Sequence, residues 1–103
     1  MSNYYRLAVL SEQKVYNLGK SYGAKDTLPI LLSTLDESQD VVLYGDESHA
    51  FLEDKYEYNE GFELVSDFAS RKELLKNIGM NLQEFYELFE KHGGLVLSVG
   101  KFL

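Results

Sequence analysis

Four leucines at helical spacing form one apolar stripe in the first half of the chain: Leu28, Leu31, Leu32 and Leu35. The 103 residues include no cysteine, so neither a disulfide nor a cysteine-bound metal can stabilise the fold. The fold therefore depends on a hydrophobic core, and the leucine stripe must pack into it. Asp26 or Thr27 can cap the start of this helix, and Pro29 in the first turn loses no hydrogen bond. The pattern predicts an amphipathic helix that packs on a sheet.

Short runs of strand-forming residues surround the stripe. The segments that predict strands are 4–10, 41–44, 50–52 and 95–99, the last of them an interior strand. Residues 11–23 stay open between helix and strand. Val15, Leu18 and Tyr22 lie at helical spacing, but glycines weaken a long helix here.

Residues 56–58 and 62–64 alternate aromatic or apolar side chains with acidic ones. A period of two is typical of half-buried strands, and residues 59–61 suit a hairpin loop. The interpretation is a β-hairpin that points its acids outward together.

Two capping-box patterns, beginning at Ser70 and Asn81, predict helices over roughly 71–78 and 82–92. Together they also have the spacing of a helix-turn-helix, with Gly79 in the turn, although the second helix is acidic. We therefore expect a simple helical hairpin. The whole pattern predicts one α+β domain over residues 1–103, with a small, mostly antiparallel sheet of five to six short strands and about three helices packed on one face.

The charge of the chain is divided by segment. Residues 36–67 hold eleven acids and one lysine, a balance of −10, while the rest of the chain sums to +3 and the total is −7. Such a surface disfavours direct binding to nucleic acid or to an anionic membrane and favours a basic partner. The N-terminal residues suggest neither a signal peptide nor a membrane span, so we expect a cytoplasmic protein.

Other kinds of site are weakly supported by the sequence. Gly19-Lys20-Ser21 lacks the earlier glycine of a phosphate-binding loop, and His49 with Asp46 or Glu53 is the single candidate metal cluster. The two histidines lie 43 positions apart. We expect no catalytic residues, no cofactor and no metal, and hence not an enzyme.

The stretch 44–61 remains as the candidate site. Its predicted partner-binding residues are Asp46, Glu47, Glu53, Asp54, Tyr56, Glu57, Tyr58 and Glu60. Carboxylates can pair with lysine or arginine, and tyrosines supply contact area. The hypothesis is an immunity-type inhibitor that neutralises a basic nuclease toxin by occluding its nucleic-acid-binding face, monomeric alone and heterodimeric with its target. A phage anti-defence mimic of nucleic acid, a helix-turn-helix regulator or adaptor, a cation-binding module and a purely solvated acidic face stay open as alternatives.

Overall fold

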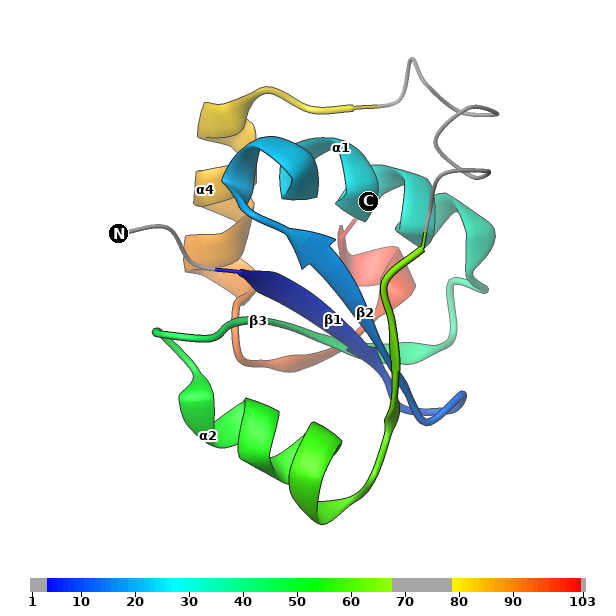
Figure 1. Cartoon of the computed structure of the whole chain (residues 1–103). Helices are drawn as coiled ribbons and strands as arrows, with labels where there is room; N and C mark the ends of the chain where they lie inside the picture. Colours follow the sequence, from blue (N-terminus) through cyan, green and yellow to red (C-terminus); the bar gives the residue numbers. More distant parts are fainter. Residues whose placement is uncertain (1–3, 68–78, 103) are drawn as a thin grey trace.

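The computed structural model describes residues 4–67 and 79–102, and its five strands form one open, mixed sheet in the order β4-β2-β1-β3-β5 (Figure 1). The central strand β1 pairs antiparallel with β2 and β3, β5 pairs antiparallel with β3, and β4 pairs parallel with β2. The strands are β1 Tyr5–Val9, β2 Lys14–Gly19, β3 Asp40–Gly45, β4 Glu63–Val65 and β5 Val96–Ser98. The α+β class and the five-stranded sheet are as predicted.

The ambiguous residues 11–23 divide between a strand and a helix. β2 returns along β1 through a tight turn in which Gln13 has a positive φ of 54°. β2 is buried on both faces of the sheet. Val15 packs into the core on one face, and Tyr16 and Leu18 pack into the core on the other. Gly19, with φ 83°, then ends the strand just before helix α1.

Helix α1 (Ser21–Thr34) begins five residues before Asp26 and buries Leu28, Leu31 and Leu32. Pro29 therefore lies inside the helix and not in its first turn. Because proline has no backbone N–H, it cannot donate the helical hydrogen bond to the carbonyl of Lys25. The backbone N–H of Met80 donates to that carbonyl instead, at 3.1 Å. The proline thus leaves an acceptor that ties α1 to the segment leading into α4 (Leu82–His92).

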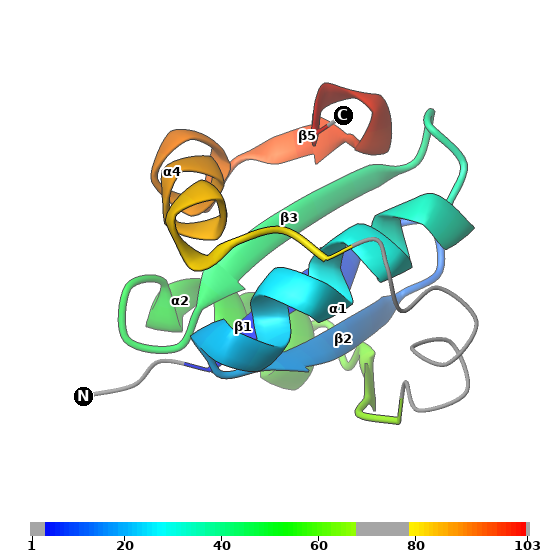
Figure 2. The ribbon, with the colours of Figure 1, turned by 90° about the horizontal axis from the view of Figure 1, so that it is seen from above.

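Helices cover both faces of the sheet, so the prediction that they pack on one face is wrong. Helices α1 and α4 lie over one face of the sheet (Figure 2). Leu7 and Val9 of β1 belong to the core that these helices cover. The other face receives α2 (Ala50–Glu53) and the π-helix η1 that continues it (Asp54–Asn59), seen below the sheet in Figure 1. The physical reason is that β1, β2 and β3 are apolar on both sides, as Ala8 and Val42 show, and each side needs a cover.

Residues 50–59 form one helical arm, α2 followed by η1, where strands were predicted over 50–52 and 56–58. Leu52 and Tyr56, about one helical turn apart, enter the core beneath the sheet, whereas Asp54 and Tyr58 are exposed. A strand would place all four side chains on the same face. β4 accordingly pairs with β2 rather than with residues 56–58. β5 lies at the edge of the sheet and is not an interior strand, and a short 3₁₀ helix η2 (Val99–Phe102) follows it.

Helix α4 confirms the prediction for residues 82–92. Asn81 caps it by accepting a hydrogen bond from the backbone N–H of Glu84 at 2.8 Å, and Phe85 is fully buried. The helix predicted over 71–78, and with it the first half of the possible helix-turn-helix, lies outside the described residues.

Candidate functional site

The eight predicted partner-binding residues do not form one exposed row. Because the arm of residues 50–59 is helical, its side chains divide between a side that faces the sheet and a side that faces solvent. Glu53, Tyr56 and Glu57 lie on the inner side, with Tyr56 only 3% exposed. Asp54 and Tyr58 lie on the outer side, and Glu47 and Glu60 are exposed before and after the arm.

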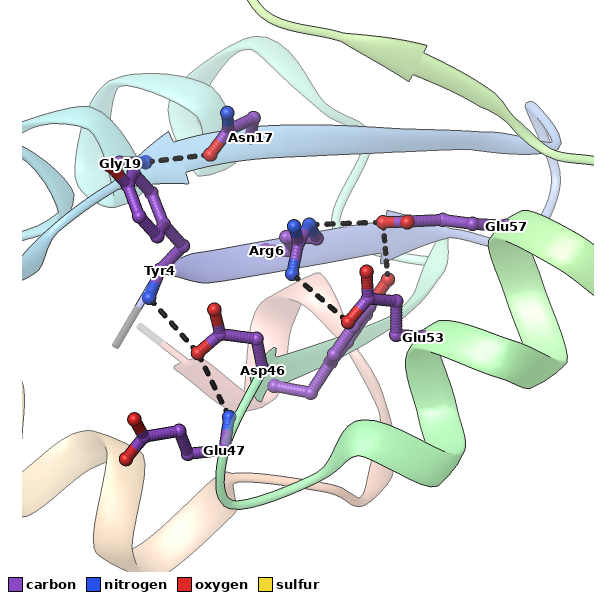
Figure 3. Close-up of polar contacts among 9 residues, drawn as sticks. Tyr4, Arg6, Asn17, Gly19, Asp46, Glu47, Glu53 and Glu57 are labelled. Atoms are coloured by element: carbon purple, nitrogen blue, oxygen red, sulfur yellow. Dashed lines mark hydrogen bonds and ion pairs between the residues drawn. The ribbon is translucent and has the colours of Figure 1, made fainter. Parts of the chain in front are cut away.

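Arg6 holds the two inward carboxylates of the arm against the sheet (Figure 3). Its Nε lies 3.0 Å from Oε1 of Glu57 and its Nη1 lies 3.6 Å from Oε2 of Glu53. Both nitrogens are buried, and neither makes a hydrogen bond of good geometry to a described residue, so the attraction is mainly between charges. The hydroxyl of Tyr44, on β3, donates to Oε1 of Glu57 at 3.3 Å. This arrangement ties α2 and η1 to β1 and β3.

The electrostatics of this cluster follow from its burial and its excess of acid. Burial raises the pKa of Glu57, and the neighbouring Glu53 adds to the rise, while Arg6 opposes it. Burial also raises the pKa of Tyr44 far above its ordinary value, with the Glu57 carboxylate as the next cause. One guanidinium thus faces two carboxylates, and Tyr44 stays neutral as a hydrogen-bond donor.

Asp46 and His49 have local roles beside the arm. Oδ1 of Asp46 accepts hydrogen bonds from the backbone N–H of Tyr4 at 3.2 Å and of Glu47 at 2.8 Å (Figure 3). The His49 ring packs edge-on against Phe51 and Phe89, its Nδ1 is buried without a hydrogen-bond partner in the described chain, and burial lowers its pKa. No cluster of three metal-ligating side chains exists among residues 4–67 and 79–102, so the His49 metal cluster does not form there.

The outer side of the arm presents two large aromatic side chains together with acid. Phe51 is 65% exposed and Tyr58 is 71% exposed, and Asp54 lies between them in the chain. Lys55 is the one base of this helix, and its Nζ lies 5.2 Å from the centre of the Tyr56 ring. We name the exposed side chains of the arm and of its flanking residues the arm face, and define it by Glu47, Phe51, Asp54, Tyr58 and Glu60. Phe51 is not among the residues predicted from the sequence, because its exposure follows from the helical form of the arm.

A second group of exposed carboxylates gathers where three connecting segments meet at one end of the sheet, the β1–β2 turn and the segments that lead into β3 and β4. The β1–β2 turn bonds to the segment before β3, since Nε2 of Gln39 donates to Ser11 at 2.8 Å, and the N–H of Glu63 donates to the carbonyl of Gln13 at 3.0 Å. We name this part of the surface the acidic end. Its exposed acids are Glu12, Asp36, Glu37, Asp40 and Glu63. Ser38 donates two hydrogen bonds to Asp36 and lowers the pKa of that carboxyl. The sequence signal was the acid excess that begins at Asp36, but the convergence depends on topology.

The exposed surface of α4 is itself acidic. Gln83, Glu84, Glu87 and Glu90 are exposed along the helix, and Lys91 is the exposed base near its end. This distribution opposes phosphate groups and weakens the case for a DNA-reading helix. At the Gly19-Lys20-Ser21 motif, the Nζ of Lys20 lies 5.6 Å from the centre of the exposed Tyr4 ring.

Comparisons of the chain with protein-family models, with curated proteins and with solved structures found no match. Within the described residues, no helix has both the length and the apolar character needed to cross a membrane.

Proposed function

We propose that this protein is an acidic inhibitor that binds a basic protein through its arm face, as an immunity-type protein that occludes the nucleic-acid-binding face of a nuclease toxin. The observation that carries the proposal is the pair of exposed aromatics, Phe51 and Tyr58, presented beside acids on a helix whose inner side is held to the sheet. Large aromatic side chains on a fixed support can bind a partner with little loss of conformational entropy.

The predicted contact set changes accordingly. Tyr56 and Glu57 belong to the fold, and Phe51 takes the place of Tyr56 as an anchor beside Tyr58. Glu47, Asp54 and Glu60 supply the charge for lysine or arginine of the partner. The acidic end and the overall charge of −7 add a long-range field that attracts a basic protein before contact.

Capture from a lysate of the source organism tests the proposal. The immobilised protein should retain one basic nuclease, and titration should abolish its activity at one chain per nuclease. The triple variant Glu47→Gln, Asp54→Asn, Glu60→Gln should lose this capture, because it removes the charge of the arm face. The identity of the captured nuclease would then distinguish two roles. One cognate toxin indicates an immunity protein, and a host enzyme indicates an anti-defence protein.

A matched control comes from the acidic end. Glu37→Gln, Asp40→Asn, Glu63→Gln also neutralises three exposed acids and brings the net charge from −7 to −4, as the arm variant does. This control should retain the nuclease. Equal loss of capture by both variants would mean that only total charge matters, and retention of no basic protein by the wild type would disprove the proposal.

A further inference from the structure

The edge strand β5 lacks the charges that protect the other edge of the sheet. Residues 93–100 contain no charged side chain, and Leu95 and Val96 are 53% and 55% exposed. At the opposite edge, β4 begins with Glu63 and follows the exposed Glu60. Charged side chains at an edge discourage pairing with another chain, so β5 is the edge open to an added strand.

The register of β5 directs backbone groups outward. The N–H of Val99 donates to the carbonyl of Gln39 at 2.9 Å, and Leu97 lies opposite Val41 on β3. Hydrogen-bonded and non-hydrogen-bonded pairs alternate along an antiparallel ladder. The N–H and C=O groups of Val96 and Ser98 therefore point away from β3, to the side where residues 4–67 and 79–102 place no strand.

We propose that a second copy of this chain occupies this edge, with the two β5 strands antiparallel about a two-fold axis at Leu97. Val96 of each copy then pairs with Ser98 of the other and exchanges backbone hydrogen bonds, which makes the contact self-complementary. The two Leu97 side chains meet across the axis as an apolar pair. The dimer has one continuous sheet, made from two sheets of five strands.

The absence of charge at the β5 edge favours a second copy of the chain over a basic protein as its binding partner. Two copies of a chain with net charge −7 repel one another wherever their acids meet, and the neutral edge lets them approach with the least repulsion. A basic protein gains no ion pair at a strand without charge and is better matched by the arm face. The inference goes beyond the proposed function and departs from the monomer expected from the sequence, while leaving the arm face of each copy on a different part of the molecule (Figure 1).

Cysteine cross-linking tests this register, since the chain has no cysteine of its own. In a non-hydrogen-bonded antiparallel pair the Cα atoms are about 4.5 Å apart, which a disulfide can span. Leu97→Cys should therefore oxidise rapidly to a covalent dimer. Leu64→Cys, in the middle of β4 at the other edge and 50% exposed, is the matched control and should oxidise slowly.

Analytical ultracentrifugation across a wide range of concentration provides the second measurement. The wild type should dimerise, Val96→Lys should remain monomeric, and Leu64→Lys should dimerise as the wild type does. A wild type that stays monomeric with Leu97→Cys oxidising no faster than Leu64→Cys would overturn the proposal, as would a dimer that cross-links through position 64. Should Leu97→Cys fail to fold, the wild type and Val96→Lys still decide the question, and capture of a nuclease is scored separately from either result.

Discussion

Glu57 carries a charge that becomes less favourable when the chain folds. Its side chain is 11% exposed, and burial together with Glu53 raises its pKa despite Arg6 and the hydroxyl of Tyr44. A folded-state pKa above the unfolded one means that the folded protein binds a proton more tightly. The stability linked to this group is fully present below the ordinary pKa of 4.5 and is lost as the pH rises through the raised pKa.

We therefore expect Glu57→Gln to gain stability relative to the wild type as the pH rises from about 4.5 toward neutral. The glutamine stays neutral and avoids the cost that the buried carboxylate acquires. Urea unfolding of both proteins at a series of pH values measures the difference. A Glu57→Gln difference that stayed constant or fell with pH would contradict the assignment of the raised pKa.

At the scale of elements, the arm depends on one residue of a different element. Arg6 of β1 faces Glu53 and Glu57, so Arg6→Met would leave two poorly solvated carboxylates side by side. Removing one partner of a buried pair costs several kcal/mol, and because these groups are partly exposed we expect a loss of about 2 kcal/mol in the free energy of unfolding. Adding Glu53→Gln and Glu57→Gln to Arg6→Met should restore most of it.

Chemical denaturation of the wild type, of Arg6→Met and of the triple variant measures this coupling. Lys55→Met is the matched control, because it removes a base from the exposed side of the same helix and should change the stability by less than about 0.5 kcal/mol. A loss for Arg6→Met no larger than for Lys55→Met would show that the arm is held by Leu52 and Tyr56 alone.

The same arm shows why local pattern was insufficient. Tyr56-Glu57-Tyr58 has the period of a strand, yet Leu52 with Tyr56 and Glu53 with Glu57 also repeat every four residues, as a helix requires. The choice between the two depends on an apolar sheet face and on Arg6, which lies some fifty positions earlier in the chain. Helix α4 needed no such information, because its cap at Asn81 and its buried Phe85 are encoded locally.

At the scale of the whole molecule, the α+β class was predictable from the leucine stripe and from the apolar runs that became β1 and β3. The distribution of charge in space was not. Glu12 and Asp40 lie at the same end of the sheet only because β1 and β3 run antiparallel, and Glu63 joins them because β4 runs parallel to β2. The acid excess was visible in the sequence, but its division among the two carboxylates that face Arg6, the arm face and the acidic end needed the topology.

This division predicts how binding should respond to salt. The field that attracts a basic partner sums over all exposed acids, so both triple variants, at net charge −4, should associate more slowly than the wild type and with a weaker dependence on salt. Dissociation depends on contacts, so only Glu47→Gln, Asp54→Asn, Glu60→Gln should dissociate faster. Biolayer interferometry with the captured nuclease, between about 50 mM salt and physiological ionic strength, separates the two rates. Faster dissociation of Glu37→Gln, Asp40→Asn, Glu63→Gln instead would move the contact surface from the arm face to the acidic end.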